Sequence, residues 1–482
     1  MKILQTIVLI LLYGTLYSQI QTFTFEYVTV DDDRLWDAIE TENGNFYLVG
    51  HIAKPESDKY RGLVIKISPD GQLIDERIID IPNRNYDIYG ILQDTLGSLI
   101  LCGKSSDTTP EMYHTNLELK RINYDLETID SSTYLIAEDK KIGGMGKSLG
   151  YNNDLLIVGG LSFETPPYGN AFIYRLDNNL DSLRFHQFSI GSIGHQIKQL
   201  NDTTYWCVGW FSGYLYAMFD TMFNLIEYTI VPDILAQAYG LKWDTDTSFF
   251  MAGEWGGGPD DDLGMLRQFH PFDTTGHIFN SWGTEGIYDY PAPNGAIDFQ
   301  NKDSVFVGAI SPFARWWYLS NYPSDYVILQ IDSLLNIRWE RFYGEGEYYY
   351  ELMKVVATKD GGCLLAGTRY NYNGGIKERD IFIVKLDNEG LLVGTNENPA
   401  IEMHEALVFP NPGTNYLNVR IAAQYKQSIF ELYDISGKQV LSKLITGKWG
   451  EVNTTFLKTG AYIYKIYNNE GLYESGKWVK QY

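Results

Sequence analysis

Short hydrophobic runs that end in glycine recur along most of the chain. The glycines that end successive runs lie between 44 residues (Gly209 to Gly253) and 59 residues (Gly308 to Gly367) apart. A repeat of about 50 residues, without stretches at the helical period, predicts repeated units made of strands. The seven run-ending glycines are Gly50, Gly103, Gly159, Gly209, Gly253, Gly308 and Gly367.

Turn-forming residues divide each unit into four short strands. The turn before the glycine-ending run has sequences such as ENGN, TLGS and KDGG, in which Asn, Asp and Gly favour hairpins. A second apolar stretch follows, such as LVIKIS from Leu63 or IFIVKLD from Ile381, and then a turn and an aromatic-rich strand. Repeated four-stranded units predict an all-β fold, a seven-bladed β-propeller, with six or eight blades as alternatives.

The segment before the first unit is expected to close the ring. FTFEYVTV from Phe23 resembles the fourth strands of the other units, and the last unit has little sequence after Val393. Pairing between the two would remove the open edges. The gaps between second and third strands vary widely in length, as do the links between units, so the face that carries both is the expected binding surface.

The two ends of the chain differ from the repeat. Residues 1–18 combine Lys2 with a short apolar stretch and a polar boundary, which predicts a cleaved signal peptide. This stretch is too short to span a bilayer, and no other transmembrane segment is predicted. The propeller is expected at residues 19–395, a polar linker at 396–406, and a small Ig-like β-sandwich at 407–482.

The composition of the chain limits the classes of partner and of metal site that we expect. The net charge of -23 argues against nucleic acid, which requires basic surfaces. The three cysteines, Cys102, Cys207 and Cys363, lie in apolar runs at nearly the same repeat position. We therefore expect buried thiols rather than disulfides or a zinc site.

Aromatic residues in the longest variable loop are the candidate ligand-binding residues. Their rings could stack on sugars or anchor a protein, and the neighbouring arginine could hold an acidic ligand. Packing between loops is the alternative, as it is for Tyr348–Tyr350 at a link between blades. The candidates are Arg315, Trp316, Trp317, Tyr318 and Tyr322.

Two acidic runs are candidate calcium sites, and calcium is the one cofactor that the sequence suggests. Asp260, Asp261 and Asp262 follow a glycine run in a long loop, and Asp31–Asp33 lie at a link between blades. Clustered carboxylates suit calcium, although neither run has EF-hand spacing and solvated acidic loops are the alternative. No HExxH, GxSxG or Walker motif is present, so no catalytic residue is assigned.

The tail carries a set of motifs in a characteristic order. They are FPNP at 409–412, YLNV at 416–419, YDISGKQV at 433–440, LKTGAYIYKI at 457–466 and GKWVKQ at 476–481. This tail resembles the type A C-terminal sorting domain of the type IX secretion system of Bacteroidetes. The resemblance implies export by that machinery, usually with removal of the tail and release or attachment at the cell surface. The residues that carry the motif are Pro410, Asn411, Pro412, Gly437, Gly460, Lys477 and Lys480.

The expected function is therefore that of a secreted or cell-surface binding protein. Its ligand would be a polysaccharide or a protein. A carbohydrate-active enzyme with acids in the central funnel is one alternative, because propeller enzymes gather such acids from separate blades. A structural component of a surface layer or biofilm is another.

Overall fold

The computed structural model of the chain describes residues 20–481 with gaps. The predicted signal peptide lies outside the described residues. Strands and turns make up the described part, and it holds no helix long and apolar enough to cross a membrane. The gaps are 55–58, 110–113, 139, 163–169, 189–192, 211–213, 232–234, 257–261, 273–275, 284–286, 315–318, 376, 394–401, 423 and 470.

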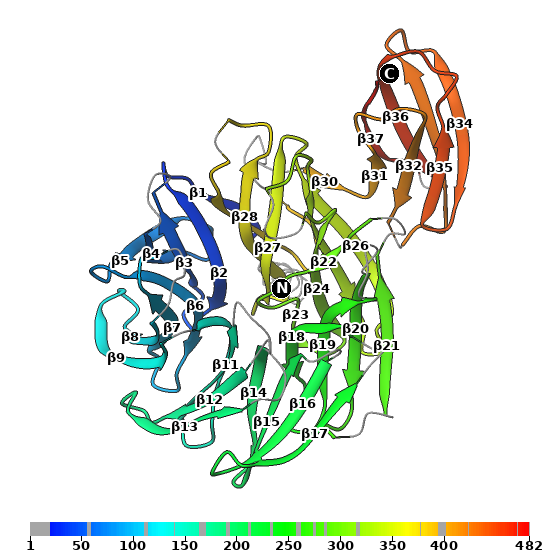
Figure 1. The fold of residues 1–482 in the computed structure, drawn as a ribbon. Helices are drawn as coiled ribbons and strands as arrows, with labels where there is room; N and C mark the ends of the chain where they lie inside the picture. Colours follow the sequence, from blue (N-terminus) through cyan, green and yellow to red (C-terminus); the bar gives the residue numbers. More distant parts are fainter. Residues whose placement is uncertain are drawn as a thin grey trace, which may run out of the picture.

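Within the described residues, seven antiparallel sheets follow one another in chain order around a ring (Figure 1). The predicted all-β, propeller-type fold is thereby confirmed. In the first five sheets, strands adjacent in the chain are adjacent in the sheet. Their strands are β2 (Asp32–Glu40), β3 (Phe46–Ala53), β4 (Tyr60–Ile67), β5 (Leu73–Ile79); β6 (Asn85–Gln93), β7 (Leu99–Ser106), β8 (Thr115–Ile122), β9 (Thr128–Ala137); β10 (Lys141–Leu149), β11 (Leu155–Ser162), β12 (Asn170–Leu176), β13 (Ser182–Phe188); β14 (Ile193–Asn201), β15 (Thr204–Trp210), β16 (Tyr214–Asp220), β17 (Leu225–Val231); and β18 (Gln237–Trp243), β19 (Phe249–Trp255), β20 (Asp262–Gln268), β21 (His277–Trp282).

Burial follows the order of strands in each sheet. In the first sheet every residue of β3 is buried, whereas most of β5 is exposed. A strand that packs against neighbouring sheets on both faces needs a continuous apolar run, which explains the glycine-ending runs. The three cysteines lie in these second strands and are buried and free, as predicted.

The N-terminal strand closes the ring. β1 (Phe23–Tyr27) pairs with β29 (Asp380–Leu386), and Phe25 lies opposite Ile383. The last sheet therefore has the order β1-β29-β28-β27, which includes β27 (Tyr348–Ala357) and β28 (Cys363–Asn371). The predicted pairing of the first strand with the last unit is confirmed.

The sixth sheet departs from the pattern in two ways. Its innermost strand is divided into β22 (Tyr290–Pro291) and β23 (Ile297–Asn301), both paired with β24 (Ser304–Ser311). Outside β25 (Asp325–Ile331) and β26 (Ile337–Gly344), it gains the strand β30 (Glu402–His404). β30 lies within residues 396–406, where the sequence predicts a polar linker. Backbone pairing such as Phe342 with His404 makes this part of the connection a strand of the sheet.

The tail is built from two further sheets around its own core. One has the order β31-β32-β35 and the other β34-β33-β36-β37. Leu417, Phe430, Ile466 and Trp478 are fully buried in the core between them. The strands are β31 (Ala406–Phe409), β32 (Tyr416–Ile421), β33 (Gln427–Asp434), β34 (Gln439–Thr446), β35 (Trp449–Asn453), β36 (Gly460–Asn468) and β37 (Gly471–Lys480).

A buried ion pair joins the tail to the sixth sheet. The Arg420 guanidinium nitrogen Nη2 lies 3.4 Å from Glu340 Oε2, and both side chains are almost completely buried. Trp282 donates its indole N–H to the same carboxylate. The guanidinium also lies over the Trp282 ring, 4.3 Å from its centroid, and over Phe342 at 4.9 Å. The tail is therefore docked on the propeller through a specific contact (Figure 1).

Candidate functional site: the central channel

The pairing register breaks at one level in the innermost strand of the sheets. In the first sheet Leu35 faces Gly50 and Asp37 faces Val49, so Trp36 is an extra, bulged residue. In the second sheet Ile88 faces Gly103, and Tyr89 is bulged in the same way. The register shifts again opposite or next to Gly159, Gly209, Gly253 and Gly367.

The sixth sheet carries a larger version of the same break. The loop of residues 292–296 separates β22 from β23 and lies opposite Gly308, whose amide donates to the Ala296 carbonyl at 2.8 Å. The side-chain amide of Asn294 in this loop donates to the Trp36 carbonyl of the first sheet at 2.7 Å. The Val355 amide of β27 donates to the Gly295 carbonyl at 2.8 Å, so the loop is fixed by the inner strands of the first and the last sheets.

These breaks explain the glycine at the end of several apolar runs, where an added Cβ atom would meet the backbone of the inner strand. A Cβ atom on Gly50 would lie 1.8 Å from the Arg34 carbonyl oxygen. On Gly253 it would lie 2.0 Å from the Gln237 carbonyl oxygen, and on Gly367 2.2 Å from that of Glu351. A bulge bends the inner strand onto its neighbour and redirects one side chain. At these three positions glycine leaves the space that the bulged strand requires.

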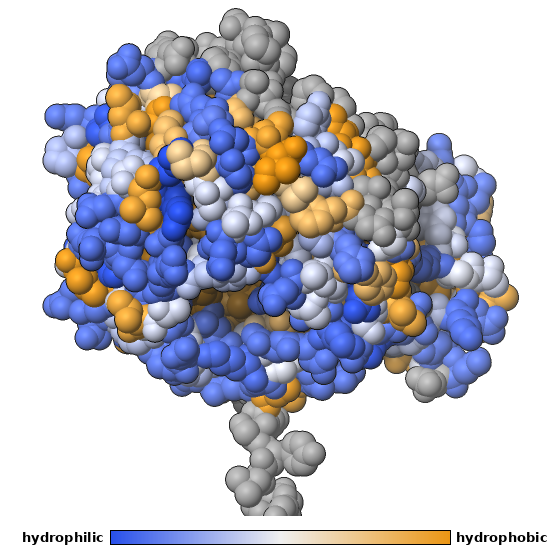
Figure 2. Space-filling view, turned by 90° about the horizontal axis from the view of Figure 1, so that it is seen from below, coloured by the Kyte–Doolittle hydropathy of each residue, from blue (hydrophilic) through white to orange (hydrophobic). Residues whose placement is uncertain are grey.

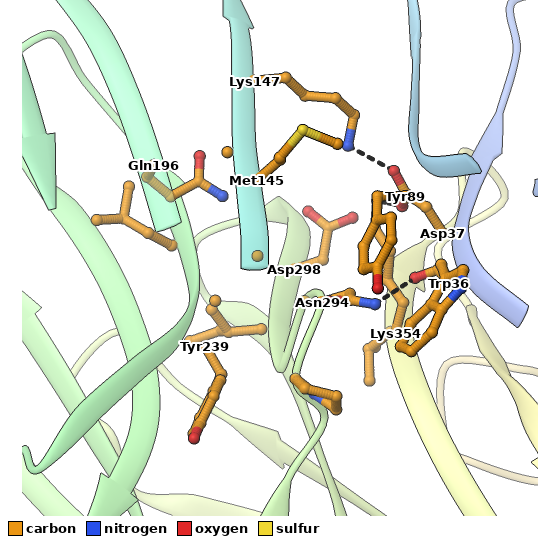
Figure 3. A pocket seen from close by; sticks show the side chains of 18 of the residues that line it. Trp36, Asp37, Tyr89, Met145, Lys147, Gln196, Tyr239, Asn294, Asp298 and Lys354 are labelled. Carbon is orange, nitrogen blue, oxygen red and sulfur yellow. Dashed lines mark hydrogen bonds and ion pairs between the residues drawn. The ribbon is translucent and has the colours of Figure 1, made fainter. Parts of the chain in front are cut away.

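Three of the bulged residues, Trp36, Tyr89 and Tyr239, line one channel at the centre of the ring. Its volume is about 630 Å³, and the innermost strand of each of the seven described sheets contributes to it. Trp36, Tyr89, Gln196 and Tyr239 enter it from four different strands (Figure 3). The outer surface seen from below is mainly hydrophilic, with hydrophobic residues in separate patches and a hollow near its middle (Figure 2).

One wall of the channel is a ladder of stacked rings and cations. Trp36 and Tyr89 stack nearly parallel, with centroids 4.7 Å apart. The Arg34 guanidinium lies 4.3 Å from the Trp36 ring centroid, and Lys104 Nζ lies 4.3 Å from that of Tyr89. Trp36 also donates its indole N–H to Asp87 at 2.8 Å. The ring faces are therefore occupied by protein groups, so this wall offers edges and charge to a ligand rather than a free stacking surface.

Two lysines from different sheets converge on one carboxylate beside this wall. Lys147 Nζ of β10 donates to Asp37 Oδ2 at 2.5 Å, and Lys354 Nζ of β27 donates to Asp37 Oδ1 (Figure 3). The Asp37 side chain is 1% exposed and also accepts the amides of Ala38 and Ile91, each at 2.9 Å. Burial raises the pKa of this carboxyl, but the two ammonium groups outweigh burial and hold it below its ordinary value.

A second carboxylate of the channel is paired as well. Asp298 Oδ1 lies 2.9 Å from Lys242 Nζ. Its two oxygens also accept the amides of Phe299 at 2.9 Å and Ala357 at 3.0 Å. Asp298 is thus fixed by hydrogen bonds from three elements. Among the described residues, no group of three or more His, Cys, Asp or Glu side chains could hold a metal ion.

Of the aromatic residues predicted from sequence, the structure describes Tyr322, which is not among the residues that line the channel. Arg315, Trp316, Trp317 and Tyr318 lie outside the described residues, so their role stays a prediction. Tyr322 is 42% exposed, and its hydroxyl donates to the Phe313 carbonyl at 3.2 Å.

The tyrosine run at the link between blades is not a surface feature. Tyr349 is 1% exposed and Tyr350 is fully buried. Both lie in β27, the innermost strand of the last sheet, where they pack against neighbouring rings. The idea that this run offers exposed aromatics is therefore wrong for these two residues, and the alternative of internal packing holds.

The acidic runs are only partly described. Asp260 and Asp261 lie outside the described residues, and the backbone of Asp262 belongs to β20, opposite Trp255. In the other run Asp31 pairs with Arg61 at 2.8 Å and Asp32 with Arg379 at 3.3 Å. Asp33 is fully buried, and its burial raises the pKa of the carboxyl to about 8. The three carboxylates of this second run therefore have three different surroundings.

Part of the predicted sorting motif forms one cluster. Trp478 donates its indole N–H to the Pro410 carbonyl at 2.8 Å, and the Asn411 amide donates to the Lys477 carbonyl at 2.7 Å. Lys480 is buried and donates to the carbonyls of Thr414 and Thr454. The first motif is thus tied to the closing strand β37. Elsewhere in the tail, Pro412 follows Asn411 and the Lys477 side chain is exposed. Gly437 lies in a turn and Gly460 begins β36, and both have positive φ.

The ring of sheets defines the class of protein, a β-propeller protein that carries a further β domain at its C-terminal end. Residues 407–481 match the family model described as the secretion system C-terminal sorting domain, which agrees with the resemblance drawn from the motifs. The chain is therefore a β-propeller protein that carries a type IX sorting domain and is exported to the cell surface or secreted. No curated protein matches the chain.

Solved structures similar to the chain share little sequence with it. One is a protein of unknown function from Bacteroides caccae, with 10% identity over 58% of this chain and 89% of that chain and a TM-score of 0.37. Another is the Pan2 WD40 domain of Neurospora crassa, with 9% identity, coverage of 73% and 88%, and a TM-score of 0.39. A third is PorZ, an essential surface component of the type IX secretion system of Porphyromonas gingivalis, with 9% identity, coverage of 93% and 81%, and a TM-score of 0.23.

Proposed function

We propose that this exported propeller is a binding protein whose central channel holds a short stretch of saccharide. The observation that carries the proposal is the register break shared by the inner strands of the described sheets, since it gathers side chains from around the ring at one level. A volume of about 630 Å³ suits a small ligand or a few sugar units and is too small for a folded protein.

The polar lining supports a ligand rich in hydroxyl groups. The side-chain amide of Gln196 projects into the channel and makes no hydrogen bond to any residue that the structure describes (Figure 3). An amide offers two donors and an acceptor, which match the paired donor and acceptor character of sugar hydroxyls. Lysine ammonium groups add further donors from the opposite side of the channel.

The carboxylates of the channel support binding rather than hydrolysis. Glycoside hydrolysis by two carboxyl groups needs one whose pKa is raised so that it can act as an acid. The carboxylates among the described lining residues are Asp37 and Asp298, and both are paired with lysines. The pKa of Asp37 is lowered, which is the wrong direction for a general acid.

Filling the channel tests the proposal. In the exported full chain, Gln196→Trp is expected to abolish the signals that the wild type gives on a glycan array, because the indole would occupy the space of the ligand. Asp202→Trp, in the exposed turn that follows the same strand, is the matched control and should keep wild-type binding. Equal binding by both variants would place the ligand elsewhere and refute the channel as the site.

A further inference from the structure

The pairing of Asp37 with two lysines leaves an uncompensated positive charge in the channel. One carboxylate neutralises one ammonium, so Asp37, Lys147 and Lys354 together carry a net charge of about +1 at neutral pH. The neighbouring pair of Lys242 and Asp298 is neutral as a unit. This local excess of positive charge lies in the channel of a protein whose overall net charge is -23.

The two ammonium groups keep hydrogen-bonding capacity for a ligand. Each ammonium has three N–H donors, and among the described residues each donates only to Asp37. Their side chains are 17% and 19% exposed, whereas Asp37 is closed off at 1%. Asp37 therefore holds the two ammonium groups in place while their remaining donors face the channel. A partly desolvated cation with unused donors favours an anionic oxygen ligand.

The backbone leaves space for both lysine side chains. A Cβ atom on Gly90 would lie 2.6 Å from Lys147 Nζ, and one on Gly295 would lie 2.9 Å from Lys354 Cγ. Both glycines belong to the register breaks of the inner strands, and Gly295 lines the channel. The breaks that build the channel thus also let the lysines of β10 and β27 reach Asp37.

We infer that the channel recognises an anionic saccharide, whose acidic group is bound between Lys147 and Lys354. This inference rests on the proposed function and names its ligand class. A carboxylate of a uronic acid and a sulfate ester share the required chemistry, since each presents anionic oxygens to two ammonium donors. A neutral glycan would leave the excess charge without a partner.

Titration calorimetry on the exported full chain distinguishes a carboxylate, a sulfate and a neutral saccharide as the ligand. The probes are a galacturonate trisaccharide, its methyl ester as the uncharged match, and a sulfated oligosaccharide of similar length. We expect the wild type to bind an acidic probe at least about tenfold more tightly than the methyl ester. The acidic probe that binds identifies the natural group as carboxylate or sulfate.

Isosteric removal of charge tests the two lysines. Lys147→Met and Lys354→Met are each expected to weaken binding of the acidic probe at least about tenfold, with little change for the methyl ester. Either variant leaves Asp37 paired with the remaining lysine, so the fold should persist, which thermal unfolding checks. Lys302→Met, at an exposed lysine outside the channel, is the matched control.

The outcomes distinguish this inference from the proposed function. Equal binding of the acid and its methyl ester would refute the anionic preference and leave saccharide binding intact. Binding of free sulfate or citrate, lost in both lysine variants, with no binding of any saccharide, would support the anion site and refute the saccharide. Binding of none of these probes would refute both.

Discussion

Replacing Gly50 by Ala is expected to lower the free energy of unfolding by about 3 kcal/mol, because overpacking against a rigid backbone has no cheap relaxation. The added Cβ atom would lie 1.8 Å from the Arg34 carbonyl oxygen, so either β2 or β3 must shift. Because Trp36 and Asp37 follow immediately in β2, the same shift should weaken ligand binding in the channel. Denaturant unfolding and calorimetry measure the two effects.

Gly346→Ala is the matched control for this substitution. A Cβ atom at Gly346 would have no neighbour within 4 Å, and the residue is exposed. An effect within about 0.5 kcal/mol is expected for such a surface position. If both alanine variants unfolded at the same denaturant concentration, the repeated glycine would have no steric role and the explanation of the repeat would fail.

The second large effect is expected at the contact between propeller and tail. Glu340→Ala should destabilise the docked state by about 3–5 kcal/mol, because it leaves the Arg420 charge buried without a partner. Small-angle X-ray scattering should show larger overall dimensions as the tail separates from the sixth sheet. Denaturant unfolding gives the energetic part of the effect.

Two further variants test the cause of that effect. The double variant Glu340→Leu/Arg420→Met removes both charges and should recover most of the stability, since an apolar pair can replace a buried ion pair. Asp303→Ala, which breaks the exposed pair with Lys302, should cost less than about 1 kcal/mol. Wild-type dimensions and stability in Glu340→Ala would show that the tail is not held by this ion pair.

Local signals in the sequence were sufficient for the architecture. Turn residues such as Gly44 and Gly361 adopt the positive φ that their hairpins require, and they mark the strand ends. The apolar runs identify the second strand of each sheet because that strand is buried on both faces. The pairing of β1 with β29 followed from one unmatched strand at each end of the repeat.

The channel could not be predicted in the same way, although one signal for it was present. Asp37 meets lysines that lie 110 and 317 residues away in the chain, and no local pattern links them. A register break is invisible to hydrophobic periodicity, since it adds one residue to a strand. The signal was the glycine itself, which recurs inside strands where no turn needs it and so indicates close approach of another backbone.

The docking of the tail escaped prediction for a related reason. Residues 396–406 are polar and resemble a linker, yet the backbone of Glu402–His404 pairs with β26. Such backbone pairing cannot be predicted from the polarity of the side chains. Glu340 and Arg420 lie 80 residues apart, and their burial depends on how the propeller and the tail meet. Such contacts follow from tertiary structure alone.

The most direct measurement is a crystal structure of the exported full chain with the tightest-binding acidic oligosaccharide. The predicted result is electron density for the sugar in the central channel, with its acidic group within hydrogen-bonding distance of Lys147 Nζ and Lys354 Nζ. Electron density for the sugar at the loop that holds Trp316 and Trp317, with an empty channel, would contradict the account. The ligand would then bind to the variable loops.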